Sequence, residues 1–137
     1  MIVLVSGGFD PIHSGHVRLL QAAAKHGRVV VALNSDEWLF RKKGYYFQDF
    51  EERREILLDH ASVSLVVPVN DTDGTVCDAL ERLRPHYFAN GGDRANPNEA
   101  EHALCLKYGI RELFGIGGDK VQSSSALVQR VLQHQHP

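Results

Sequence analysis

Short apolar runs alternate along the chain with segments whose apolar residues recur at helical spacing. The runs that predict strands are Ile2–Val5, Val29–Leu33, Val63–Val69, His86–Ala89 and Ile110–Phe114. The first three are rich in Val, Ile and Leu with little alternation, which is typical of strands covered on both faces. Strand–helix alternation of this kind predicts an α/β fold with a single doubly wound parallel sheet. We expect one domain over residues 1–132 and a short tail over 133–137.

The predicted helices lie between these strands and after the last one. Their apolar positions are Val17, Leu20 and Ala24, ending at Gly27; Phe50, Leu57 and Leu58; Val76, Leu80 and Leu83, ending at Pro85; and Leu127, Val128, Val131 and Leu132, starting at Ser123. A further helix has clear end signals, with Asn96 as N-cap, Pro97 at the first helical position, Glu99 completing a capping box and Gly109 past the end. Its inward stripe is predicted to be Ala100, Ala103, Leu104 and Lys107. The stretch Trp38–Gln48 has no regular pattern and is predicted to be a mobile loop.

Composition narrows the class of protein. The 137 residues are 43% hydrophobic and 23% charged, as in a globular domain. With 15 basic and 17 acidic residues the net charge is -2, which disfavours a general nucleic-acid surface. Cys77 and Cys105 are isolated, so we expect buried thiols in a reducing compartment and no zinc site. Met1 leads directly into a predicted strand, and no apolar run has membrane-spanning length; a cytoplasmic location is therefore expected.

The most informative segment follows the first predicted strand and runs from Gly7 to His16. Gly7 and Gly8 allow the backbone to approach an oxyanion closely, and Ser14 is the expected N-cap of the next helix. His13 and His16 then fall on one side of the first helical turn. Imidazoles, free backbone N–H groups and a helix N-terminus in one place suit phosphate oxygens.

Other interpretations of the histidine pair are open on the residues alone. The two rings could simply cap and solvate a helix start, or they could ligate a metal with Asp10, although tight sites usually take three or four protein ligands. The dinucleotide pattern GxGxxG is absent, and so is the phosphate-binding pattern GxxxxGK[ST]. A dinucleotide-dependent dehydrogenase and a P-loop kinase are therefore disfavoured.

The segment His13-Ser14-Gly15-His16 resembles the HxGH signature of the nucleotidyltransferase superfamily, which includes cytidylyltransferases and adenylyltransferases. Further resemblances follow in family order: Gly8-Phe9-Asp10, Val31-Ala32-Leu33-Asn34-Ser35-Asp36, Lys42-Lys43-Gly44, Glu51-Glu52-Arg53, Gly91-Gly92-Asp93 and Gln122-Ser123-Ser124-Ser125. The ordered set spans roughly residues 2 to 130 and is far more specific than the four-residue signature. It implies a Rossmann-like nucleotidyltransferase fold.

The resemblance also implies an activity. A phosphorylated small acceptor would attack the α-phosphorus of CTP or ATP and release pyrophosphate. The acceptor is already an oxyanion, so catalysis reduces to alignment and charge stabilisation. The catalytic residues implied are His13, His16, Lys43 and Ser124. Nucleotide binding is implied for Gly8, Phe9, Asp10, His13, His16, Gly91, Asp93, Lys120, Ser123, Ser124 and Ser125, and acceptor binding for Arg18, Lys42, Lys43 and Arg53. Mg²⁺ would arrive on the nucleotide, with Asp10 as its candidate protein ligand.

Some features depart from the family pattern. The expected phosphate-binding arginine before the serine motif is missing, and Lys120 or Arg94 is the candidate replacement. The segments at 34–36 and 91–93 favour the branch that activates heptose with ATP, whereas the short chain equally suits the glycerol-3-phosphate branch that uses CTP. The resemblance also suggests a homodimer. The alternatives are a nucleotide-binding sensor without turnover, an adenylyltransferase acting on pantetheine phosphate or nicotinamide mononucleotide, and a flavodoxin-like electron carrier.

Overall fold

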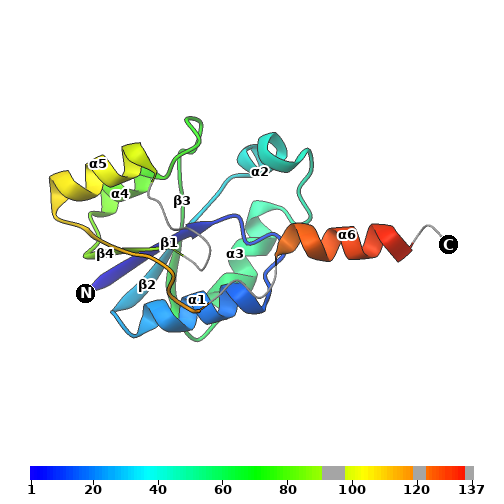
Figure 1. Ribbon diagram of the computed structural model, residues 1–137, viewed down its shortest axis with the longest axis horizontal. Helices are drawn as coiled ribbons and strands as arrows, with labels where there is room; N and C mark the ends of the chain where they lie inside the picture. Colours follow the sequence, from blue (N-terminus) through cyan, green and yellow to red (C-terminus); the bar gives the residue numbers. More distant parts are fainter. Residues whose placement is uncertain (91–97, 119–122, 135–137) are drawn as a thin grey trace.

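Five parallel strands form one sheet in the computed structural model, which describes residues 1–90, 98–118 and 123–134 (Figure 1). The strands are β1 (Ile2–Gly7), β2 (Arg28–Leu33), β3 (Val63–Pro68), β4 (Tyr87–Ala89) and β5 (Arg111–Leu113). Their spatial order is β3-β2-β1-β4-β5, and every neighbouring pair is parallel. The predicted doubly wound α/β sheet is confirmed, and each strand overlaps its expected run.

In the described ranges, five helices connect the strands and cover the sheet, and a sixth, α6, follows the last strand. They are α1 (Ser14–Ala24), α2 (Asp36–Lys43), α3 (Phe50–Leu58), α4 (Cys77–Leu83), α5 (Glu99–Tyr108) and α6 (Ser124–His134). Helices α1 and α3 pack on one face, where Leu20 and Leu57 meet Val3 and Val5 of β1. On the opposite face α4 and α5 cover Leu4 and its neighbours (Figure 1). Strand β1 is therefore buried from both sides, and its carboxyl end opens into the turn that holds the histidines.

The segment after β2 corrects the sequence interpretation. Residues 38–43 do not form a loop; they belong to α2. Ser35 caps this helix by accepting a hydrogen bond from the Trp38 amide, and Gly44 ends it in the left-handed conformation. Acidic residues occupy its first turn and basic residues its last, both of which stabilise a helix. Only Leu39 of this helix is buried, so apolar periodicity could not reveal it.

Helix α5 also differs from its prediction at the N-terminus. Its N-cap is Asn98, whose side chain accepts a hydrogen bond from the Glu101 amide, and not Asn96. The inward residues are Glu101 and Cys105, whereas Ala100, Ala103 and Lys107 are exposed. Of the predicted stripe only Leu104 packs against the core, because the charged Glu101 points inward to accept the Val76 amide at the start of α4. The expected end at Gly109 is confirmed.

The last helix, α6, extends away from the sheet and has no buried residue (Figure 1). It runs to His134, two residues beyond the expected domain boundary. Cys105 is buried as predicted, and Cys77 is half-buried. None of the helices in the described ranges has the length and apolar character needed to cross a membrane.

Candidate active site

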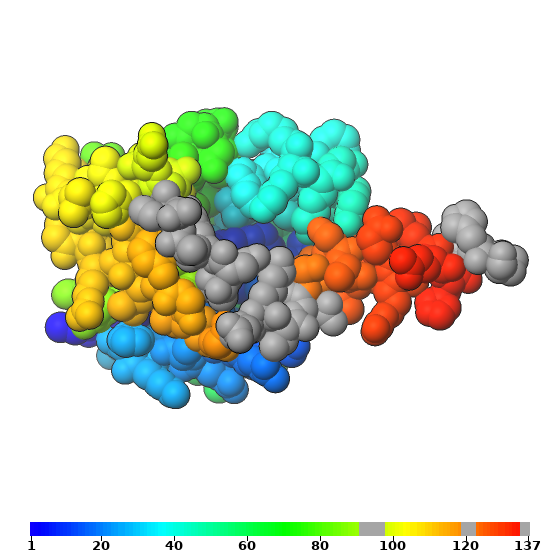
Figure 2. All heavy atoms as spheres, in the orientation of Figure 1, coloured from blue at the N-terminus to red at the C-terminus, as the bar shows by residue number. Residues whose placement is uncertain are grey.

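The turn between β1 and α1 is tightly folded against α2. A Cβ atom on Gly8 would lie 2.6 Å from Cδ2 of the buried Leu39, so only glycine fits without displacing that side chain. Phe9 has a φ of 49°, a conformation that bulky residues rarely adopt, while its ring is buried against the core. Such local strain is typical of functional turns. The Asp10–Pro11 peptide bond is cis. Figure 2 shows the N-terminal segment (dark blue) recessed between α2 (cyan) and the start of α6 (orange).

The two histidines form a capping box at the start of α1. His13 is the N-cap, in place of the predicted Ser14, which is the first helical residue. The Gly15 amide donates to Nδ1 of His13 over 3.1 Å, and the His13 amide donates to Nδ1 of His16 over 3.2 Å. The rings stack at a centroid distance of 3.7 Å. Since each Nδ1 accepts a hydrogen bond, each neutral ring carries its proton on Nε2 and presents an N–H donor there.

His16 is held neutral by its surroundings. Burial, followed by the neighbouring charges of His13 and Lys43, lowers the pKa of His16 to about 3. The Phe9 ring lies against it at a centroid distance of 4.6 Å. A neutral imidazole keeps its Nε2 proton at every physiological pH. It can therefore donate a hydrogen bond to phosphate over that whole range.

Lys43 brings a positive charge to the same turn from the end of α2. Its Nζ donates to the Asp10 carbonyl over 3.0 Å and lies 5.8 Å from the centroid of the Tyr45 ring. Burial lowers the pKa of Lys43, with the charges of Lys42 and Arg53 acting in the same direction and Asp10 opposing them. Lys42, by contrast, is exposed, and its Nζ lies 4.7 Å from the centroid of the Trp38 ring. Of these two lysines, Lys43 is the one that contacts the turn.

Asp10 joins the histidine turn to the segment that follows α2. Its side chain is buried, and its carboxylate oxygens accept the amides of Phe47 and Gln48, each over 2.7 Å. The carboxylate therefore fixes the segment that follows α2. In the described part of the chain no three His, Cys, Asp or Glu side chains gather as a metal site. Arrival of Mg²⁺ on the nucleotide remains a prediction.

Arg53 occupies a different place from the one expected of an acceptor-binding residue. Its side chain has 0% exposed surface, and its Nη1 donates to the carbonyls of Gly8 and Asn34. Its Nε donates to the Gln48 carbonyl, and its Nη2 pairs with Asp36 over 2.7 Å. A guanidinium enclosed in this way does not reach an acceptor. Arg53 instead joins the β1 turn, the end of β2 and the start of α3, so it positions the site.

The serine motif reaches the same turn from the far end of the chain. Oγ of Ser124 donates to the Pro11 carbonyl over 2.9 Å, which joins the N-terminus of α6 to the β1–α1 turn. Oγ of Ser123 accepts the Ala126 amide in the first turn of α6. The serine motif and the histidine turn, which the sequence assigned to one site, are therefore in contact although they lie more than a hundred positions apart. Gly91, Asp93, Arg94 and Lys120 fall outside the described residues.

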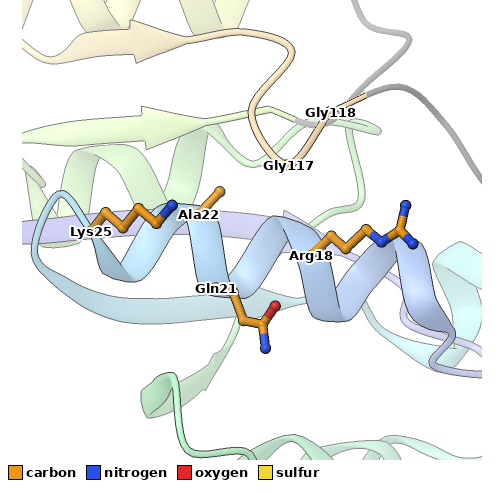
Figure 3. Close-up of a pocket in the computed structure, with 6 residues that line it drawn as sticks. All are labelled: Arg18, Gln21, Ala22, Lys25, Gly117 and Gly118. Carbon is orange, nitrogen blue, oxygen red and sulfur yellow. The ribbon is translucent and has the colours of Figure 1, made fainter.

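Arg18 lies one helical turn beyond His16 and lines a depression of about 590 Å³ along α1 (Figure 3). Lys25 lines the other end, and the backbone of Gly117 and Gly118 borders it. In Figure 3 the side chains of Arg18, Ala22 and Lys25 point toward the loop that contains Gly117 and Gly118, and Gln21 points away.

A five-stranded parallel sheet with an HxGH capping box at the carboxyl end of its central strand defines a Rossmann-like nucleotidyltransferase fold. Residues 4–130 match the model of the cytidylyltransferase-like family, and the chain belongs to that family.

Its curated relatives include the bifunctional protein HldE of several bacteria. The HldE of Gluconobacter oxydans is 42% identical over 111 residues, which cover 79% of this chain and 23% of that protein. The HldE of Shewanella baltica is 31% identical over 137 residues, covering 98% of this chain and 28% of that protein. The chain thus spans about a quarter of the length of these relatives. Among solved structures, a lipopolysaccharide core biosynthesis protein from Thermoplasma volcanium has the same fold, with a TM-score of 0.73, 22% identity and coverage of 88% and 98% of the two chains.

Proposed function

We propose that this chain is a nucleotidyltransferase that transfers a nucleoside monophosphate from ATP or CTP to a sugar or polyol phosphate. The observation that carries the proposal is the stacked pair of His13 and His16 beside Lys43, at the carboxyl end of β1, in which burial holds His16 neutral. Ligands of doubly wound sheets bind at this edge. Membership in the cytidylyltransferase-like family and similarity to HldE support the same reaction class.

The reaction needs alignment and charge stabilisation. An oxygen of the acceptor phosphate forms a bond to the α-phosphorus, the bond from that phosphorus to the bridging oxygen breaks, and pyrophosphate leaves with the electron pair. No proton must be removed from an acceptor that is already an oxyanion. The Nε2–H groups of His13 and His16 would donate to the α-phosphoryl and bridging oxygens, where negative charge grows. Lys43 would stabilise the same charge from the side of α2.

The helix N-termini and the supporting residues complete the assignment. The first amides of α6 and the hydroxyls of its serines would hold the terminal phosphates. Mg²⁺ bound to the triphosphate would neutralise part of its charge, and phosphate oxygens would supply its ligands. Asp10 and Arg53, which are buried behind the turn, would hold the turn and α2 in fixed positions relative to each other. A homodimer and the choice between ATP and CTP remain predictions.

The test is pyrophosphate release with each of the four nucleoside triphosphates against a panel of sugar and polyol phosphates. We expect release with one nucleotide and one acceptor class, and a loss of roughly a hundredfold in kcat for His16→Ala, which corresponds to about 3 kcal/mol of transition-state stabilisation. His13→Ala should behave similarly.

The matched control is His60→Ala. Nδ1 of His60 accepts the amide of Ser62 two residues later, just as His13 accepts that of Gly15, but His60 lies between α3 and β3. Its loss should leave kcat unchanged. Nucleotide binding without pyrophosphate release would instead identify a sensor, and equal losses for His13→Ala and His60→Ala would contradict the assigned site.

A further inference from the structure

Asp71 is a buried carboxylate that belongs to no part of the site described so far. It follows β3, is 3% exposed, and lies beside the connection between β2 and α2. Its Oδ2 accepts Nδ2 of Asn34 over 3.1 Å and the amide of Ser35 over 2.8 Å. Its Oδ1 accepts the hydroxyl of Ser35 over 2.8 Å. Because this carboxylate accepts three hydrogen bonds from the β2–α2 connection, it fixes that connection to the end of β3.

These bonds determine how α2 begins. The Ser35 hydroxyl donates its proton to Asp71, so its oxygen is oriented to accept the Trp38 amide and cap the helix. A second attachment lies further along α2, where Nη2 of Arg41 donates to the Asp71 carbonyl over 2.9 Å. The negative carboxylate also suits the positive end of the helix dipole. Asp71 therefore holds the start of α2 through its carboxylate and a later position of α2 through its backbone carbonyl.

The end of α2 carries the lysine that contacts the histidine turn. Lys43 is its last residue, and Nζ of Lys43 reaches the Asp10 carbonyl. A helix of eight residues is about 12 Å long, so a tilt of ten degrees at the first residue displaces the last by roughly 2 Å. Displacement on that scale would break the contact between Lys43 and the turn, and misplacement by an ångström is enough to impair catalysis strongly.

We infer that Asp71 is a positioning residue that fixes α2 and, through it, places the Lys43 ammonium beside the histidine pair. Asp71 does not touch the reacting groups. The role of Lys43 in transfer rests on the proposed function, whereas the placement of Lys43 by Asp71 does not depend on any substrate.

The first experiment needs no activity. The NMR signal of ¹³C-labelled Lys43, assigned with Lys43→Arg, is titrated with pH in the ligand-free protein. Burial lowers the pKa of Lys43 in the intact site. Asp71→Ala removes the side-chain bonds to Asn34 and Ser35 but keeps the backbone carbonyl that binds Arg41. Loss of the side-chain bonds should loosen the start of α2 and move the Lys43 pKa up toward the ordinary lysine value. An unchanged Lys43 titration in a folded Asp71→Ala protein would overturn the inference.

The matched control is Glu101→Ala. Glu101 is also a buried carboxylate that accepts an amide at the start of a helix, but it serves α4 on the opposite face. Its loss should not shift the Lys43 titration; an equal shift would overturn the inference, because it would show a general loosening of the fold. Where Asp71→Ala does not fold, Ser35→Ala removes the same hydroxyl link and should raise the Lys43 pKa in the same direction; no shift there overturns the inference.

The second experiment is a double-mutant cycle on pyrophosphate release. Asp71→Ala should lower kcat by about tenfold with little change in the nucleotide KM, and Asp71→Asn, which keeps the shape and one acceptor, should restore most of it. In a Lys43→Ala background, Asp71→Ala should change kcat by less than twofold. Effects that multiply would mean that Asp71 does not act through Lys43. Absence of transfer in the unaltered protein would refute the proposed function, while the titration would still decide the placement of Lys43.

Discussion

His16 shows at the scale of one residue how the chain prepares a neutral donor. Two features act together on it: burial in the turn, to which the Phe9 ring contributes, and the His13 and Lys43 charges nearby. Both disfavour the imidazolium form. The hydrogen bond from the His13 amide to Nδ1 then leaves the proton of the neutral ring on Nε2. Sequence spacing indicated that the two rings share a side of the helix, but not that backbone amides select their tautomers.

The lowered pKa of His16 has a consequence for stability. Between pH 6.5 and about 3 the unfolded chain binds a proton at His16 that the folded chain does not. The free energy of unfolding should therefore fall as pH falls through this window, with a contribution from His16 of about 1.4 kcal/mol per pH unit. His16→Gln should show a shallower decline in urea unfolding measured at pH 4, 5, 6 and 7. Parallel curves for the two proteins would show that His16 protonates normally in the folded state.

At the scale of elements, the strands were easier to predict than the helix ends. Buried strands such as Val29–Leu33 are uniformly apolar because both faces are covered, and that signal is local. Helix α2 was missed because it buries only Leu39; its evidence lay in the Ser35 cap and the sign of its terminal charges. The stripe of α5 was right only at Leu104, because a buried Glu101 serves another helix, which a hydrophobicity pattern does not register.

The loop after β5 depends on a close approach to α1. Gly117 and Gly118 both have a φ of +86°, but only a Cβ on Gly117 would meet a neighbour, the Leu19 amide nitrogen at 2.9 Å. Gly118→Ala should cost about 1 kcal/mol for its backbone conformation alone. Gly117→Ala should cost about 2 kcal/mol more, because the α1 backbone cannot yield as a side chain can. Chemical denaturation of both variants measures the difference, and equal losses would mean that the loop does not rest on α1.

At the scale of the molecule, the site is assembled from segments that meet only in the folded chain. The β1 turn supplies the histidines, α2 supplies Lys43, and the N-terminus of α6 supplies Ser124. The order of family motifs along the sequence indicated this assembly. What the sequence could not show is which residues support the site without facing it. Arg53 and Asp10 match the family pattern, but both are buried behind the turn. Burial depends on contacts between distant segments, so a sequence motif does not reveal it.

Arg53 is expected to be essential for the fold itself. Arg53→Ala removes the donors for the carbonyls of Gly8, Asn34 and Gln48 and leaves Asp36 without its partner. We expect a loss of about 3 kcal/mol in the free energy of unfolding. Its neighbour Arg54 is exposed and lies 3.6 Å from Glu51, so Arg54→Ala should change stability by no more than about 0.5 kcal/mol. Urea unfolding of the two variants compares them directly, and similar values would refute the positioning role.

The central claim is that the Nε2–H groups of His13 and His16 contact a nucleoside triphosphate. Long-range ¹H–¹⁵N NMR of the imidazoles, recorded during titration with ATP and with CTP, tests it most directly. We expect both rings to carry their proton on Nε2 in the free protein, and these two Nε2 signals to shift on nucleotide binding while those of His60 stay in place. Saturable nucleotide binding that leaves the His13 and His16 signals unmoved would contradict it.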